Sequence, residues 1–395
     1  MPRPVSRSAD RRPGRAARLG ILGTTFAVLA VLLTAASTLG LPGRHPSSHA
    51  TRDVAATTAL TTLPPVRHVF VVNIENKGFD TTWGRHSAAP YLARTLRSRG
   101  VLLKQYYGTA HHSLGNYLAQ VSGQGPDDDT QHDCPRYTAF VQTRKAVAPG
   151  QVVGHGCVYP RTVATLPGQL DAAGYTWRGY MEDMATPCQH SRLGGAEQWS
   201  SATRTEQYAT RHNPFMYFRS ITSRPSYCRD HVKRLAALTT DLRHVSTTRS
   251  LSYVTPDLCH DAHDARCADG GPGGLRAANA WFKTWIPKIL HSPAFQQDGM
   301  LVITADESEG LAEDSRGCCG EGAGPNAKRP GIDGPGGGRI GALVISPFTT
   351  PGTTSRTAYN HYALLGSIEK LFGLRRLGYA RTVTHLFGAD VYAAS

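Results

Sequence analysis

The chain has 395 residues, of which 40% are hydrophobic and 18% charged, so it can bury a core in one large α/β domain or two smaller ones. Its formal net charge of +14 is an excess that many nucleic-acid-binding proteins share. However, six arginines lie within the first 18 residues, and the other basic residues are scattered along the chain. This distribution argues against a nucleic-acid partner and suits a small anionic substrate equally well.

The first 36 residues have the pattern of an export signal. Arginines precede an apolar run over residues 19–36, which ends in small residues. The run is slightly long for a cleaved signal and slightly short for a membrane span, so cleavage and retention as a membrane-contacting anchor both stay open. Either outcome gives a secreted or extracytoplasmic protein. Residues 37–64, rich in Thr, Ser, Ala and Pro, are predicted to be a flexible linker, and residues 65–395 a folded domain.

Eight cysteines favour disulfides in an oxidising compartment, because their number is even. A zinc site is the competing interpretation, but no pair has the two-residue spacing of a zinc knuckle. Closeness in sequence suggests four pairs: Cys134 with Cys157, Cys188 with Cys228, Cys259 with Cys267, and Cys318 with Cys319.

After residue 65, short β-branched runs alternate with amphipathic stretches, which is typical of an α/β fold with a mostly parallel sheet. The runs are continuously apolar, so their strands are expected to be buried on both faces. Strands are predicted at 69–74, 176–181, 251–255, 301–304 and 340–345, and helices at 89–99, 114–121, 276–290 and 363–372. The expected fold class is therefore a three-layer α/β/α domain.

Polar side chains follow three of these strands. Glu75 and Asn76 follow the first, residues 257–264 follow the third, and Asp306 and Glu307 follow the fourth. Parallel strands deliver such residues to one edge of the sheet, where open α/β folds bind ligands. Carboxylates gathered there repel one another unless a cation neutralises them, and oxygen ligands suit Ca²⁺, Mg²⁺ or Mn²⁺. One divalent metal ion is therefore expected. The alternative is that Asp306 and Glu307 cap the next segment and Glu75 lies at the surface.

Ser113 precedes a stretch in which Leu114, Leu118 and Val121 predict an amphipathic helix, so it suits the N-cap position. A helix N-terminus also attracts phosphate and stabilises an alkoxide, so a metal-bound serine there can act as a nucleophile. No Gly-x-Ser-x-Gly motif surrounds any serine, which weakens a serine-hydrolase interpretation. Capping and catalysis are thus the two interpretations of Ser113.

Two histidines lie where they can serve a phosphate ester. His263 is in the donor-rich segment 256–264, and His361 opens a late helix. An imidazolium can bind a phosphoryl oxygen or protonate a leaving alcohol. Both are therefore catalytic candidates, with simple helix capping as the alternative for His361.

Together, these segments resemble the bacterial phosphoesterase family that includes acid phosphatase A and the phosphocholine-type phospholipases C, within the alkaline phosphatase superfamily. The matching segments are HVFVVNIENKGFD at 68–80, SLGNYL at 113–118, PDLCHDAHD at 256–264, ITADE at 303–307, and ISP at 345–347 followed by YNHY at 359–362. The likeness runs from about residue 66 to 380 and implies an alkaline-phosphatase-like fold.

The resemblance also implies roles for individual residues. Ser113 would be the phosphorylated nucleophile, bound to the metal. Asp261 or Asp264 would join the metal shell or orient a histidine. Four residues would hold the metal together with Ser113: Glu75, Asn76, Asp306 and Glu307. Four would surround the phosphate oxygens: Asn76, Asn116, His263 and His361.

The function expected is that of an exported, metal-dependent acid phosphatase that uses a serine nucleophile. Its partner would be a phosphate-ester substrate, with phospholipids and phosphoinositides among the candidates. Two alternatives stay open. One is a phosphodiesterase of the phospholipase C type. The other is a catalytically silent, exported protein that binds anionic lipid or cell-wall phosphate.

Overall fold

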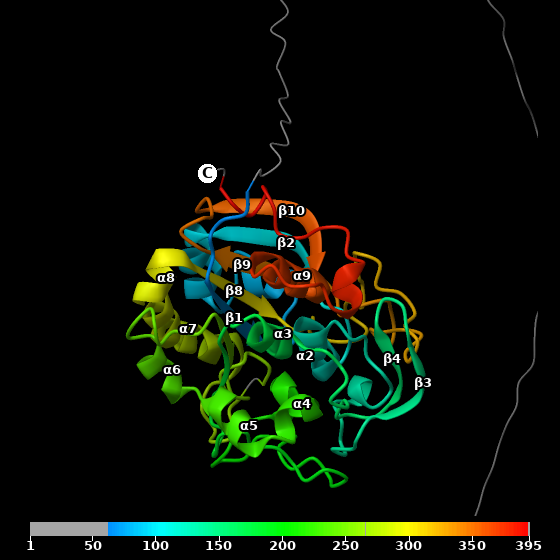
Figure 1. The fold of residues 1–395 in the computed structure, drawn as a ribbon. Coiled ribbons are helices and arrows are strands. Elements are labelled where there is room, and N and C mark those ends of the chain that lie inside the picture. The colour runs from blue at the N-terminus through cyan, green and yellow to red at the C-terminus, as the bar shows by residue number, and fades with distance from the viewer. Residues whose placement is uncertain (1–61, 265, 394–395) are drawn as a thin grey trace, which may run out of the picture. The chain divides into compact units, whose positions relative to one another are not determined.

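The computed structural model describes residues 62–264 and 266–393 (Figure 1). The predicted export segment, residues 1–36, and the predicted linker as far as residue 61 lie outside these ranges. Within the described ranges, none of the helices combines the length and the apolar character that a membrane crossing requires.

In the described part of the chain, eight strands form one sheet in the order β10-β2-β9-β8-β1-β7-β5-β6, and two more form a hairpin, β3-β4. Only β9 runs antiparallel to its neighbours in the large sheet. The strands are β1 His68–Ile74, β2 Val101–Tyr107, β3 Val141–Val147, β4 Gln151–His155, β5 Trp177–Met181, β6 Val232–Arg234, β7 Leu251–Thr255, β8 Gly299–Ala305, β9 Ala342–Ile345 and β10 Thr353–Asn360. The predicted α/β class with a mostly parallel sheet is confirmed.

Strand β1 lies at the centre of the sheet and explains why its sequence is a continuous apolar run. All seven of its residues are buried. Val71 is in register with Tyr253 of β7 on one side and with Val302 of β8 on the other. Helices cover both faces of a parallel sheet, so each face needs apolar side chains. This packing fixes the end of β1 and therefore the position of Glu75 and Asn76, which follow it directly.

The helices form two groups. Helix α2 contacts both α3 and α9, whereas α7 contacts α8, which packs on β1 and β8. Figure 1 shows α2, α3 and α9 in front of the sheet and α7 and α8 at its left. The helices are α1 Phe79–Trp83, α2 Ser113–Ser122, α3 Leu166–Ala172, α4 Arg219–Thr222, α5 Pro225–His231, α6 Ala236–Asp241, α7 Gly274–Leu290, α8 Pro293–Asp298 and α9 His361–Leu371. The π-helix is η1 Tyr91–Leu96, and the 3₁₀-helices are η2 Arg97–Arg99, η3 Thr130–His132, η4 Thr210–His212, η5 Pro214–Tyr217 and η6 Gly378–Arg381.

Three of the four predicted helices are confirmed as α2, α7 and α9, with small shifts at their ends. The prediction for residues 89–99 is wrong in type, because the chain forms the π-helix η1 and then the 3₁₀-helix η2. Strands β2 and β10 had not been predicted from the sequence. Strand β10 consists mostly of polar residues, so it lacks the apolar run on which the prediction depended.

All eight cysteines are paired as their spacing suggested. The bonds join Cys134 to Cys157, Cys188 to Cys228, Cys259 to Cys267, and Cys318 to Cys319. The first two close loops with sequence separations of 23 and 40 residues. These loops lie between strands of the large sheet, where the chain has few regular elements to stabilise it.

We predict that the Cys188–Cys228 bond stabilises the fold more than the Cys318–Cys319 bond. Replacing both Cys188 and Cys228 by alanine should lower the free energy of unfolding by about 4 kcal/mol, because the unfolded chain gains the freedom of a long loop. The matched double variant at Cys318 and Cys319 opens no loop, so it should lower the free energy of unfolding much less. Denaturant unfolding measures both losses. Equal losses, or free thiols in the unfolded but unreduced protein, would contradict the prediction.

Candidate active site

The carboxyl ends of β1, β7 and β8 bring acidic side chains to one edge of the sheet. Glu75 follows β1, Asp261 lies beyond β7, and Asp306 and Glu307 follow β8. All four are buried. The backbone of Glu75 donates to the carbonyl oxygen of Asp261 at 2.6 Å, which ties the ends of β1 and β7 together. The gathering of carboxylates predicted from the strand ends is therefore present, and the alternative of a surface-exposed Glu75 is wrong.

Glu75 lies at the centre of this cluster. Its carboxylate accepts a hydrogen bond from the Ser113 hydroxyl at 2.9 Å and another from the Tyr117 hydroxyl. His212 Nε2 lies 3.2 Å from Glu75 Oε2. Ser113 and Tyr117 are four residues apart on α2 and therefore share one face of that helix. One carboxylate thus connects the sheet edge to the start of α2.

Asp306 organises the turn after β1. Its Oδ1 atom accepts from the backbone N–H of Asn76 at 2.9 Å and from that of Glu307 at 2.7 Å. Asn76 has a φ of 41°, in the left-handed region that asparagine adopts more readily than most residues. This conformation turns the chain directly after Glu75 and points the Asn76 N–H at Asp306.

Burial perturbs all four acidic groups. It raises the pKa of Glu75 and of Glu307 well above the ordinary value, and neighbouring negative charges, Asp306 above all, raise both further. Burial also raises the pKa of Asp261 and of Asp306. The four groups can therefore lie together only if they bind protons or share a cation.

The residues present fit a divalent cation. Within the described residues, four buried side-chain oxygens of this cluster have no hydrogen-bond partner: Asn76 Oδ1, Asp261 Oδ2, Asp306 Oδ2 and Glu307 Oε2, the last of which forms an ion pair with His111. A buried oxygen without a partner is costly, and a hard cation satisfies such oxygens. Glu75, Asn76, Asp306 and Glu307 would hold it, beside Ser113.

Ser113 is not the N-cap of its helix. Helix α2 begins at Ser113 itself and His112 occupies the N-cap position, without a side-chain cap bond. The side chain of Asp133 caps the helix instead, accepting from the Leu114 N–H at 2.9 Å. The Ser113 hydroxyl is therefore free for its bond to Glu75, which disfavours the capping interpretation.

A pocket of about 410 Å³ opens above this serine. It is lined by Ser113, Asn76 and Glu307 from the cluster, by His263 and Arg211, and by the apolar side chains of Pro135, Trp199 and Leu311. Burial lowers the pKa of Arg211, but the charges of Asp133, Glu75 and Asp261 outweigh it and raise that pKa above its ordinary value. The guanidinium is therefore a permanent positive charge in the pocket wall.

His263 lines the pocket, and its Nδ1 atom pairs with Asp264 at 2.6 Å. Its backbone N–H donates to Asp261 Oδ1 at 2.8 Å. Asp264 therefore orients this histidine, one of the two roles that the resemblance suggested for Asp261 or Asp264. The Nε2 atom remains available to a substrate.

His361 and Asn116 lie behind the pocket wall. His361 is fully buried, with Nε2 at 2.7 Å from the Asp306 carbonyl oxygen and Nδ1 at 3.1 Å from the Tyr106 hydroxyl. Burial lowers the pKa of His361 to about 4, so the ring is neutral near pH 7. Its placement favours support of the Asp306 backbone over contact with phosphate.

Asn116 orders the turn that precedes the serine. Its Oδ1 atom accepts from the N–H groups of Thr109 and Ala110, at 2.7 and 2.9 Å. Its Nδ2 atom donates to the carbonyl oxygens of Ala110 and His112. These bonds use both amide hydrogens, so the expected phosphate contact of Asn116 does not fit this arrangement.

Arg211 and His212 had not been identified from the sequence. His212 stacks on Tyr117, with ring centroids 5.5 Å apart, and its Nδ1 lies 3.6 Å from Asp261 Oδ2. Burial lowers the pKa of His212, and the charges of Arg211 and His263 lower it further. Both residues lie in the short 3₁₀-helix η4 between β5 and β6, where no strand end marks them; the adjacent basic pair was the only signal.

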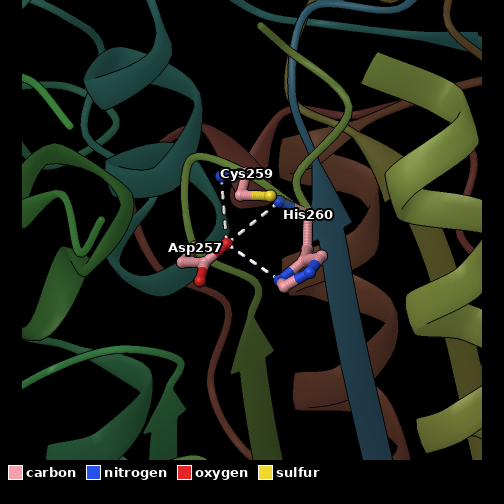
Figure 2. A group of neighbouring side chains, drawn as sticks. All are labelled: Asp257, Cys259 and His260. Atoms are coloured by element: carbon pink, nitrogen blue, oxygen red, sulfur yellow. Dashed lines mark hydrogen bonds and ion pairs between the residues drawn. The ribbon is translucent and has the colours of Figure 1, made fainter. Parts of the chain in front are cut away.

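A second group of possible ligands, Asp257, Cys259 and His260, lies beyond β7 (Figure 2). Cys259 is bonded to Cys267, so it offers no thiolate. Asp257 Oδ1 accepts from the backbone N–H groups of Cys259 and His260 and lies 3.0 Å from the His260 ring. Hydrogen bonds to Asp257 and Glu182 raise the pKa of His260 to about 10. This group is a structural ion-pair network.

The comparison with known proteins identifies the family of the chain. A model of the Phosphoesterase family matches residues 85–375, which is most of the chain. The chain belongs to this family. The resemblance predicted from the sequence is therefore confirmed at the level of the family.

Individual relatives are distant. An acid phosphatase from Aspergillus fumigatus is 24% identical over 314 residues, which are 78% of this chain and 55% of the relative. The chain thus spans about half the length of such fungal relatives. A phosphatidylinositol-3-phosphatase from Mycobacterium tuberculosis is 24% identical over 84% of this chain and 86% of its own length. A solved alkaline phosphatase superfamily protein from Vibrio parahaemolyticus superposes with a TM-score of 0.43 at 12% identity, covering 80% of this chain and 68% of that one.

We predict that Asp306→Asn weakens the binding of a divalent cation at least tenfold, because it removes a charge while keeping the bonds of Oδ1. Calorimetric titration with Ca²⁺, Mg²⁺ and Mn²⁺ measures the affinity. Glu369→Gln is the matched control, because Glu369 is also a buried carboxyl but lies on α9. A wild-type protein that binds none of the three ions would contradict the prediction, as would equal losses in both variants.

Proposed function

We propose that the protein is an exported, metal-dependent phosphatase of phosphomonoesters in which Ser113 is the nucleophile. The observation that supports this most is the 2.9 Å hydrogen bond from the Ser113 hydroxyl to Glu75, inside a buried carboxylate cluster that opens into a pocket. A serine with a merely structural role has no need of such surroundings. Family membership supports phosphate-ester chemistry, and the four disulfides support an extracytoplasmic location.

The proposed reaction has two displacement steps. Ser113 Oγ forms a bond to phosphorus as the bond from phosphorus to the ester oxygen breaks, and the alcohol leaves with a proton. Water then displaces the serine oxygen, which regains its proton, and inorganic phosphate is released. A divalent cation bound by Glu75, Asn76, Asp306 and Glu307 would neutralise these carboxylates and favour the alkoxide of the serine.

The chain's own residues have separate tasks in this reaction. Arg211 places a fixed positive charge in the pocket, where a dianionic phosphate gains from it. The start of α2 adds the positive end of the helix dipole. His263, held by Asp264, is the candidate to protonate the leaving alcohol. His361 acts as a neutral support behind Asp306.

The substrate is proposed to be a monoester, with phosphoinositides as candidates because one relative is named for that activity. A phosphodiesterase remains the second candidate, since the pocket has an apolar wall formed by Pro135, Trp199 and Leu311. Such a wall would accept the second substituent of a diester or the glycerol part of a lipid. A silent binding protein is disfavoured, because the chain has both the proposed nucleophile and the proposed ligands.

We predict that Ser113→Ala lowers kcat on p-nitrophenyl phosphate by a factor on the order of 10⁴, because no group is left to accept the phosphoryl group. Ser122→Ala, at the other end of the same helix, is the matched control and should keep its turnover. Denaturant unfolding should show that both variants are folded. A Ser113→Ala protein with a tenth of the wild-type turnover would reduce the serine to a structural role.

We also predict a larger kcat/KM for p-nitrophenyl phosphate than for bis-p-nitrophenyl phosphate. The monoester carries one more negative charge for Arg211 and the helix N-terminus to stabilise. Steady-state kinetics across pH, on protein with its metal restored, measure the ratio. A larger value for the diester at every pH would overturn the monoesterase assignment in favour of the phospholipase C type.

A further inference from the structure

A second pocket, of about 370 Å³, lies at the C-terminal end of α2, opposite the end that carries Ser113. It is lined by Arg375, Arg376 and Arg381, and by neutral side chains such as Gln124 and Gln169. Within the described residues none of the three arginines pairs with a carboxylate, and all three are exposed. Three unpaired guanidinium groups around one pocket make it attractive to anions.

The positive charge extends over two segments that meet at this pocket. Residues 141–170 and residues 370–389 contain no Asp or Glu, although they hold seven Lys and Arg residues. Arg381 Nη1 donates to the Pro149 carbonyl oxygen at 3.1 Å, and Gln169 Nε2 donates to the Arg375 carbonyl oxygen at 2.5 Å. These bonds join the two acid-free segments into one surface, which we call the basic face.

The hairpin β3-β4 adds apolar side chains to the basic face. All seven residues of β3 are exposed. Val141 and Val147 are 53% and 40% exposed, and only Leu193 is a comparably exposed large hydrophobic residue in the described chain. Arg144 and Lys145 lie between the two valines. Figure 1 shows the hairpin at the right-hand rim, beyond α2 and clear of the sheet.

We infer that the basic face is a docking surface for an anionic membrane. Cationic side chains together with exposed aliphatic ones match a bilayer surface, which offers both negative headgroups and an apolar layer. A single-stranded nucleic acid would be expected to stack on aromatic side chains, and the exposed large hydrophobic residues of β3 are valines. A free phosphate ion would use the arginines but not the hairpin.

The hairpin also connects this surface to the active site. At its far end, His155 Nδ1 lies 3.7 Å from Asp129 Oδ2. The residues directly after Asp129 include His132 and Asp133, which line the Ser113 pocket. A bilayer held along the hairpin would therefore lie beside the pocket. This consequence rests on the proposed function, whereas the docking itself does not.

Hydrogen exchange of the full chain on vesicles tests the docking, because it reports on the amides of the basic face separately from those of the N-terminal segment. Amides of residues 141–151 and 374–385 should exchange several-fold more slowly with vesicles of phosphatidylcholine and phosphatidylglycerol than with phosphatidylcholine alone. The triple variant Arg375→Gln, Arg376→Gln and Arg381→Gln should lose this protection. Equal exchange on both vesicle types would overturn the proposal.

A matched variant and other anions complete the test. Arg94→Gln, Arg97→Gln and Arg99→Gln remove the same charge from η1 and η2 and should leave the protection intact. Equal loss in both triple variants would reduce the effect to net charge and overturn the proposal. Equal protection by inorganic phosphate, or by single-stranded DNA at the same salt concentration, would replace the membrane by a small-anion site or a nucleic-acid surface.

Activity separates this proposal from the proposed function. Both triple variants should hydrolyse soluble p-nitrophenyl phosphate like the wild type, because neither touches the Ser113 pocket. With a phosphoinositide in anionic vesicles, only the Arg375, Arg376 and Arg381 variant should show a raised KM. An inactive wild type would refute the proposed function while the exchange result still decides the docking. An unchanged KM would refute the link between docking and catalysis.

Discussion

The mutual repulsion of buried carboxylates is the constraint on which the rest of this structure depends. Glu75, Asp261, Asp306 and Glu307 meet at one sheet edge, and burial raises the pKa of each. Hydrogen bonds from Ser113 and Tyr117, together with a nearby neutral imidazole, offset only part of this cost. Oxygens without partners remain, and they are the donors that a hard cation prefers.

The surrounding loops serve to hold this edge in place. Asn116 uses its whole side-chain amide to fix the turn before Ser113, and His361 supports the Asp306 backbone from behind. Gly337 packs so closely that a Cβ there would lie 2.3 Å from the Ala110 carbonyl oxygen. Residues that resemble ligands in the sequence can thus act one layer further out, as positioning groups.

Helix α2 separates two kinds of chemistry. Its N-terminal end presents Ser113 to a pocket with an acidic floor, and its C-terminal end borders a pocket of unpaired arginines. The acidic floor fits a cation and, through it, a phosphate ester, whereas the basic face fits an anionic surface. The β3-β4 hairpin borders the second pocket and contacts Asp129, close in sequence to His132 and Asp133 of the first, so substrate delivery and catalysis have a common structural basis in this proposal.

The sequence by itself determined the fold class, the central strands and the carboxylates at the sheet edge, because strands buried on both faces must be apolar and their polar successors mark that edge. It also determined the cysteine pairing, because each partner is nearby in the chain. Only the tertiary structure revealed Arg211 and His212, which reach the site from the short 3₁₀-helix η4, and β10, whose mostly polar residues carry no apolar pattern. It also gives His361 and Asn116 buried hydrogen-bond partners within the protein, since residue type fixes what a side chain can bind but packing decides which partners it meets.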